Sequence, residues 1–254
     1  MTTDLTGKEI LLRALRNETT PRPAWLPFVG AHGAHIIDQS AADYLRSADL
    51  LVEGLRKADE LYQPDGLPVC FDLQIEAEVL GCDLNWPDDG PPSVSSHPLE
   101  QGRNKLEDLP VFDADSGRMP VVLEATRRIK EEIGDRVALY GLICGPYTLT
   151  LHLLGNDIFL EMFDNPMRVK TIMGFATEVA KRAAQAYVEA GVDVVAVVDP
   201  MTSQISPDHF ESFVTPYVNM VFDHVRSLDA YSSLFVCGDA TRNLHVMAQT
   251  TCDN

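Results

Sequence analysis

The chain has 254 residues, 45% of them hydrophobic, and its 38 acidic and 20 basic side chains give a net charge of -18. This composition supports a sizeable core, whereas the negative charge argues against binding to nucleic acid or to an anionic membrane surface. The longest apolar runs, such as 192–198, are far shorter than the roughly 20 residues that span a bilayer, and no signal peptide is expected. Five scattered cysteines fit reduced thiols in the cytoplasm better than a disulfide framework.

Short apolar segments alternate along the chain with segments of helical spacing. Thr6 and Glu9 form a capping-box pattern that predicts an opening helix, and Ser40 predicts the cap of a helix that runs to about Tyr62. The predicted strands are Trp25–Val29, Leu67–Asp72, Val137–Ile143, Asp193–Val198 and Leu234–Val236. The other predicted helices are Pro120–Gly134, a short one near Ile158–Phe163, a long one from Asn165 to Gly191, one from Ser206 with a kink at Pro216, and one from about Arg242. Residues 86–115, rich in Pro, Gly, Asp and Ser, predict a long loop, which is uncommon unless functional.

The alternation of strands and helices predicts βα units and a parallel sheet. The β-branched run within Asp193–Val198 supports this interpretation, because strands of parallel sheets are buried on both faces. An open doubly wound sheet and a closed eight-stranded barrel both fit the pattern. Periodicity leaves the choice open, since a barrel needs eight strands and only five are predicted.

The C-terminal ends of the strands are where chemistry gathers in both architectures, so the residues after each strand are the candidate site. The candidate catalytic groups are His32, His35, Asp72 and Asp199; the candidate substrate-binding residues are Glu76 and Tyr147; the candidate metal ligand is Cys237. We expect six of these side chains to line one cavity, with perturbed pKa values for the enclosed carboxylates of Asp72 and Asp199. The six are His32, His35, Asp72, Tyr147, Asp199 and Cys237.

Each candidate also has a structural interpretation. The histidines fit surface or capping groups, Asp72 fits a helix cap, and the negative charge of Glu76 suits a helix start. Cys70 and Cys144 lie in apolar runs and fit small buried hydrophobes, whereas Cys237 fits a metal ligand or a nucleophile. Rossmann, P-loop and Gly-x-Ser-x-Gly patterns do not occur, which disfavours hydride transfer, nucleotide hydrolysis and serine esterase chemistry.

Three segments resemble the uroporphyrinogen decarboxylase superfamily. They are Gly141–Leu149 with its Gly-Pro-Tyr-Thr-Leu turn, Ala190–Asp199, and Ile205–Tyr217 with its Ser-Pro-x-x-Phe-x-x-Phe spacing. The resemblance runs along nearly the whole chain and implies a (β/α)8 TIM barrel with N-terminal helices, as one domain over residues 1–254. That barrel has three more strands after Leu234–Val236, so the resemblance implies that the last three βα units are missing.

Within the superfamily, the resemblance is nearer to the corrinoid-dependent (methylcobamide:thiol) methyltransferases than to the decarboxylases. True decarboxylases carry Arg-Gln-Ala-Gly-Arg after strand one, where this chain has Phe28–His35 without an arginine. Asp72–Gly81 resembles the Thr-x-Glu-Ala-Glu-x-Leu-Gly segment of the methyltransferases, with Gln74 at the threonine position.

The resemblance implies methyl transfer between a small methylated compound or a thiol and a corrinoid that a partner protein carries. It also implies zinc bound by Cys237, although Phe235 stands at the position of the family's histidine and the family's second cysteine would lie beyond Asn254. His32 or His35 could supply a nitrogen ligand in its place. Two alternatives stay open, namely a cofactor-free uroporphyrinogen decarboxylase of tetrapyrrole biosynthesis and an inactive barrel that binds a partner. The sequence also leaves open whether the chain forms a homo-oligomer.

Overall fold

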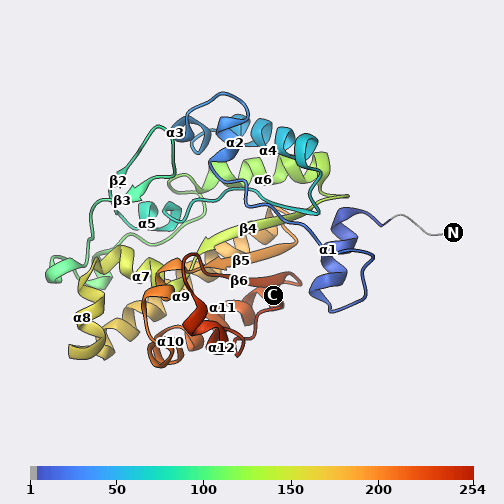
Figure 1. The fold of residues 1–254 in the computed structure, drawn as a ribbon. Helices are drawn as coiled ribbons and strands as arrows, with labels where there is room; N and C mark the ends of the chain where they lie inside the picture. The colour runs from blue at the N-terminus through green and yellow to red at the C-terminus, as the bar shows by residue number, and fades with distance from the viewer. Residues whose placement is uncertain (1–4) are drawn as a thin grey trace.

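The computed structural model describes residues 5–254 and contains a parallel sheet surrounded by helices (Figure 1). The sheet consists of β1 (Gly66–Pro68), β4 (Ala138–Cys144), β5 (Val194–Val198) and β6 (Tyr231–Phe235), in the order β1-β4-β5-β6. Every neighbouring pair is parallel, with Leu67 opposite Leu139, Ile143 opposite Val197, and Val197 opposite Leu234. The predicted α/β class and parallel sheet are therefore confirmed.

Helices connect these strands, and all of the larger ones except α1 lie on the outer face of the sheet. They are α1 (Gly7–Leu15), α2 (His32–His35), α3 (Ala41–Tyr44), α4 (Ala48–Tyr62), α5 (Ile75–Val79), α6 (Met119–Ile133), α7 (Pro146–Leu154), α8 (Asp157–Asp164), α9 (Pro166–Glu189), α10 (Pro207–Phe213), α11 (Thr215–Ser227) and α12 (Leu244–Met247). In Figure 1, α4 and α6 pack together above the strands, and α9 and α11 pack together below and behind them. No helix within residues 5–254 is long and apolar enough to cross a membrane.

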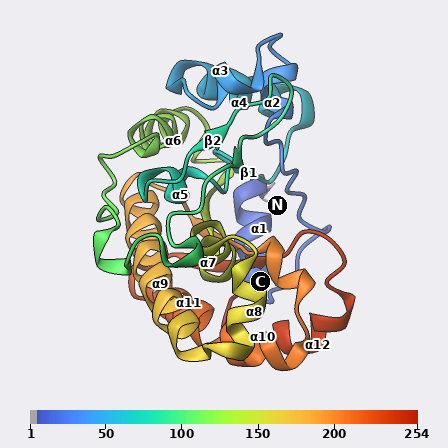
Figure 2. The ribbon, with the colours of Figure 1, turned by 90° about the vertical axis from the view of Figure 1, so that its left-hand side faces the viewer.

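The alternation of side chains along the strands divides the core into two clusters. Val195 and Val197 of β5 pack in the larger cluster, which the helices share, whereas Val194 and Ala196 pack in a smaller cluster on the inner face. Leu11 of α1 covers part of this inner face. Because the strands are parallel, their C-terminal ends meet at one edge of the sheet, on the left in Figure 1 and facing the viewer in Figure 2.

The predicted first strand, Trp25–Val29, is wrong. A ladder requires repeated pairs of backbone hydrogen bonds, whereas β1 and its flanks give this segment a single one, from Asp65 N to Trp25 O (2.9 Å). The segment instead lays the partly buried Leu26 and Phe28 over the inner face of the sheet. Within residues 5–254 the main sheet therefore has four of the five predicted strands.

Local capping explains most differences in helix boundaries. The helix predicted from Ser40 to Tyr62 is two helices, because Ser47 also acts as an N-cap and accepts a hydrogen bond from Leu50 N. The kink predicted at Pro216 is confirmed as a break at Val214 between α10 and α11. Helix α7 was not predicted, since Gly-Pro after β4 suggested only a turn.

The predicted loop 86–115 contains some regular structure. Strand β3 (Ser93–Val94) pairs with β2 (Leu84–Asn85) in a small antiparallel ladder, and single 3-10 turns cover Glu100–Gly102 and Leu106–Asp108. At the other end of the chain, residues 253–254 run along β6, with Leu234 N donating to Asn254 O (2.8 Å).

Candidate active site

Asp199 directly follows β5 and is fully buried. Its carboxylate accepts hydrogen bonds from Tyr147 N (3.2 Å), Thr148 N (2.7 Å) and the Thr148 hydroxyl (2.6 Å), all in the first turn of α7. These amides have no partner within the helix, so Asp199 caps α7 from the neighbouring strand. Burial raises the pKa of Asp199 to about 6, although the hydrogen bonds from Thr148 oppose the shift. The carboxylate thus positions α7 and does not face an open cavity, which corrects its predicted place.

Asp72 acts as a cap for the turn before α5, which is the structural alternative that the sequence left open. One carboxylate oxygen accepts a hydrogen bond from Gln74 N (2.9 Å), which caps the turn before α5, and the other accepts one from Arg118 Nη1 (2.6 Å). Arg118 Nε also donates to Glu78 (2.7 Å). Burial raises the pKa of Asp72, and the charge of Arg118 opposes that shift. Asp72 is therefore enclosed in an ion-pair network whose cation, Arg118, sequence reasoning missed.

Glu76 on α5 is buried and completes the hydrogen bonding of the sheet. Gly145 N donates to Val198 O of β5, so the preceding amide, Cys144 N, points toward the β1 side. Strand β1 has already ended at Pro68, and Glu76 Oε1 accepts the Cys144 amide in its place (3.1 Å). Burial raises the pKa of Glu76 to about 7.

The three carboxylates converge at the end of β4. Burial raises the pKa of the Cys144 thiol, and the charges of Glu76, Asp199 and Asp72, in that order, raise it further. Of the six residues that were expected to converge, Asp72 and Asp199 both lie near Cys144, with Glu76 beside them, and burial raises the pKa of all three carboxylates. However, helices α5 and α7 enclose the carboxylates, so they do not line an open cavity.

The raised pKa of Glu76 predicts that the free energy of unfolding depends on pH. Its pKa of about 7 in the folded chain lies above the ordinary value of 4.5, so between these values the folded chain holds a proton that the unfolded chain has lost. The free energy of unfolding therefore falls as the pH rises through this window, by roughly 3 kcal/mol for this group. We expect Glu76→Gln, which keeps an oxygen for Cys144 N, to match the unsubstituted chain near pH 4.5 and to be more stable at pH 8. Urea denaturation at both pH values checks this, and an equal loss of stability at both would contradict it.

The histidines do not share this site. His32 and His35 are exposed on α2, which packs against α4 in the helical layer (Figure 1). His32 Nε2 lies 2.7 Å from the hydroxyl of Tyr62, the last residue of α4, whose end leads to the N-terminal end of β1. The prediction that these histidines stand at a strand C-terminus is wrong, because Trp25–Val29 is not a strand that could carry them there.

Tyr147 is likewise separate from any open surface. It is fully buried, and its hydroxyl lies 3.8 Å from Met162 Sδ, between α7 and α8. Burial raises its pKa, with a smaller contribution from the charge of Asp199. The predicted contact of Tyr147 with a substrate is thus replaced by a packing contact between two helices.

The residues present do not fit the zinc site that the resemblance implies. Cys237 is half-buried after β6, and a single cysteine does not make a zinc site, which takes three or four protein ligands. Phe235, at the position of the family's histidine, stacks on Phe28 with ring centroids 4.4 Å apart. Within residues 5–254, no group of three or more His, Cys, Asp or Glu side chains is arranged to hold a metal ion. We therefore assign no chemical step to zinc.

Two groups of residues at the strand ends are partly exposed to solvent. We call these two groups, together with Cys237, the mouth. The aromatic group is Phe28, Phe71 and Phe235, whose ring centroids lie 4.4 to 6.4 Å apart. The polar group is Ser203, Asp239, Thr241 and Arg242, which line a pocket of about 470 Å³. Arg242 Nη2 donates to Ser203 O (2.9 Å), so the connections after β5 and β6 meet here. Sequence reasoning missed Arg242, whose available signal was a basic residue after the last strand of an acidic chain.

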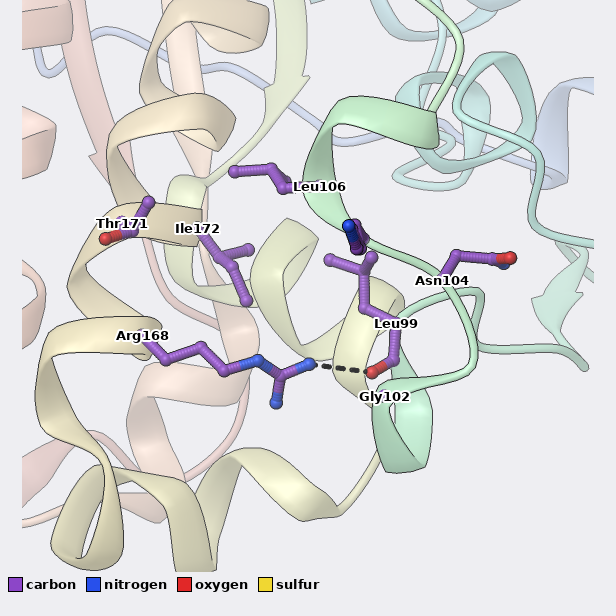
Figure 3. Close-up of a pocket in the computed structure, with 8 residues that line it drawn as sticks. Leu99, Gly102, Asn104, Leu106, Arg168, Thr171 and Ile172 are labelled. Carbon is purple, nitrogen blue, oxygen red and sulfur yellow. Dashed lines mark hydrogen bonds between the residues drawn. The ribbon is translucent and has the colours of Figure 1, made fainter.

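A separate cavity of about 350 Å³ lies between the segment of residues 99–106 and helix α9 (Figure 3). Its lining residues include Leu99, Leu106 and Ile172, and the guanidinium of Arg168 donates to Leu99 O (3.0 Å). Arg168 is also paired with Glu161. The cavity includes none of the predicted site residues, and its cation already has partners, so we assign it no catalytic role.

A four-stranded parallel sheet with helices on its outer face and polar groups at the C-terminal ends of its strands defines an α/β protein, and this arrangement fits part of a barrel. Comparison with known proteins gives the family. The profile of the uroporphyrinogen decarboxylase (URO-D) family matches residues 6–254, and the chain belongs to this family.

The relatives separate the two branches of the family. Methylcobamide:CoM methyltransferase MtbA of Methanosarcina acetivorans is 29% identical over 255 residues, which cover 98% of this chain and 75% of the relative. Uroporphyrinogen decarboxylase of Prochlorococcus marinus is 24% identical over 250 residues, 92% of this chain and 70% of the relative. A solved structure of a methyltransferase from Methanosarcina mazei has a TM-score of 0.88 at 26% identity, over 98% of this chain and 75% of its own. The predicted position nearer to the methyltransferase branch is thus confirmed.

Proposed function

We propose that this chain transfers a methyl group between a corrinoid, carried by a partner protein, and a small thiol or methylated compound. The observation that carries the proposal is the match to a methylcobamide:CoM methyltransferase along 98% of the chain, together with the TM-score of 0.88 to a methyltransferase structure. The mouth is the proposed place of reaction, because barrels of this type work at the C-terminal ends of their strands.

The reaction is a displacement at a methyl carbon. With a methylated corrinoid as donor, a sulfur–carbon bond forms, the cobalt–carbon bond breaks with its electron pair left on cobalt, and the thiol proton passes to solvent. In the opposite direction, cobalt attacks the methyl carbon, the bond from that carbon to the donor breaks, and the demethylated donor leaves with the bonding pair. The rings of Phe28, Phe71 and Phe235 would exclude water from the reacting face, which favours attack by a weakly solvated nucleophile.

The same rings weigh against porphyrinogen decarboxylation. A substrate with many carboxylates requires cationic partners, and the segment Phe28–His35 carries no arginine. Phe28 and Phe235 instead place two stacked apolar rings at the mouth. The polar group contains one arginine, Arg242, which could bind the polar end of a small molecule.

Arg242 gives this proposal a test at residue level. We expect Arg242→Ala to raise the KM for the small substrate by about tenfold, with little change in kcat, because the guanidinium binds a part of the substrate that does not react. The assay follows methyl transfer from methylcobalamin to a thiol under anoxic conditions. Arg127→Ala, at an exposed position on α6, is the matched control and should change neither constant. Equal effects of the two substitutions would remove the polar group from the substrate site.

A further inference from the structure

An exposed apolar patch lies where helix α8 leads into helix α9. Leu160 and Phe163 of α8 are 68% and 70% exposed, and Met167 in the first turn of α9 is 70% exposed. Leu160 and Phe163 are three residues apart on one helix and therefore share a face. We call these three residues the α8 patch. Large apolar side chains gathered on a surface mark sites of contact with other proteins.

The α8 patch lies on the functional side of the sheet. Helices α7 and α8 form the connection that leaves the C-terminal end of β4, and Figure 2, which looks onto the strand ends, shows α8 and α10 on the near side. The ring of Phe163 lies 5.0 Å from that of His209 on α10, the helix that follows the connection after β5. A protein that reaches the mouth from outside would thus meet this patch.

Three carboxylates border the patch beside Phe163 and His209, whereas Arg168 and Lys170 follow Met167 on α9. Asp164 follows Phe163, while Asp208 and Glu211 flank His209, and all three carboxylates are exposed. None of these three carboxylates forms an ion pair with another residue in the range 5–254. A second copy of this acidic chain would bring two negative borders together, whereas a partner with a basic border would complement them.

We propose that the α8 patch is the docking surface for the corrinoid-carrying protein, through a contact surface on that protein that is apolar at its centre and rich in lysine and arginine at its edge. The inference rests on the proposed function, which requires a corrinoid on another protein to reach the mouth. The apolar centre supplies affinity, and the charged border supplies orientation and a faster encounter.

The test measures binding and turnover separately in the triple variant Leu160→Gln, Phe163→Gln, Met167→Gln. Its control is Leu61→Gln, which changes an apolar residue, 54% exposed, in the last turn of α4 near the opposite end of the strands. The protein probe is the methylated corrinoid protein purified from the source cell by its cobalt content. Free methylcobalamin is the small probe, which needs no docking surface.

We expect the triple variant to bind the corrinoid protein at least about tenfold more weakly, while its rate with free methylcobalamin stays unchanged. Added salt should weaken binding by the unsubstituted chain, since it screens the charged border. Leu61→Gln should alter neither measurement.

An unchanged Kd in the triple variant would overturn the docking site. So would a dimer of the unsubstituted chain that the same substitutions dissociate, because the patch would then be a contact between copies. A lack of methyl transfer from free methylcobalamin would count against the proposed function instead, and the Kd for the corrinoid protein would still decide the docking site.

Discussion

Gly145→Ala is expected to lower the free energy of unfolding by more than about 3 kcal/mol, a large part of the stability of an ordinary domain. The added Cβ would lie 2.3 Å from Asp199 Cγ and 2.4 Å from its Oδ2. The carboxylate cannot move aside without losing the hydrogen bonds from Tyr147 and Thr148 that cap α7. The backbone of Gly145, at φ -64, suits alanine, so the whole effect comes from this contact.

Gly174→Ala is the control for this substitution. Gly174 lies inside α9, and a Cβ there would meet no atom within 4 Å, so alanine should stabilise the chain by up to about 1 kcal/mol through its helix propensity. Urea denaturation of both variants measures the difference. Similar stabilities for the two alanine variants would show that Asp199 is not held against α7.

Arg118→Met is expected to cost about 3 to 5 kcal/mol, because it leaves Asp72 as a buried charge without its partner. The double variant Arg118→Met, Asp72→Asn should recover much of this loss, since asparagine carries no charge and can still accept the hydrogen bond from Gln74 N. The exposed Arg127→Ala should cost less than about 0.5 kcal/mol.

The same variants separate a structural from a catalytic Asp72. In the structural account, methyl transfer by the double variant returns together with its stability, because Asp72 only holds the turn before α5. The account is wrong if the double variant regains stability and stays inactive, for then the carboxylate itself takes part in the reaction.

The sequence predicts a strand well where the composition of the segment itself indicates that both faces are buried. The β-branched residues of Val194–Val198 suit a strand buried on both faces and no other element of that length. Trp25–Val29 is also apolar, but Val29 is its one β-branched residue and Pro27 cannot donate to a ladder. A strand also needs a neighbour, and the backbone of this segment receives one hydrogen bond from the β1 side. Pairing of that kind depends on distant residues and does not show in a local pattern.

The candidate site also has a part that the sequence could predict and a part that it could not. Topology alone predicts that Asp72 and Asp199 meet, because each follows a parallel strand. Their enclosure could not be predicted, because it depends on α7 and on Arg118, which is 46 residues from Asp72 in sequence. The absence of a family-type zinc site was easier to predict, because Phe235 stands at the position of the family's histidine and a phenylalanine cannot bind zinc.

The rate of methyl transfer by the unsubstituted chain, with methylcobalamin as donor and a panel of small thiols as acceptors, tests the central claim most directly. Under anoxic conditions, the absorbance of methylcobalamin reports the loss of its methyl group, and mass spectrometry identifies the methylated thiol. We predict loss of methylcobalamin that depends on the chain, with an equal amount of methylated product, and no decarboxylation when uroporphyrinogen is supplied instead. Conversion of uroporphyrinogen without any transfer from methylcobalamin would contradict the proposed function.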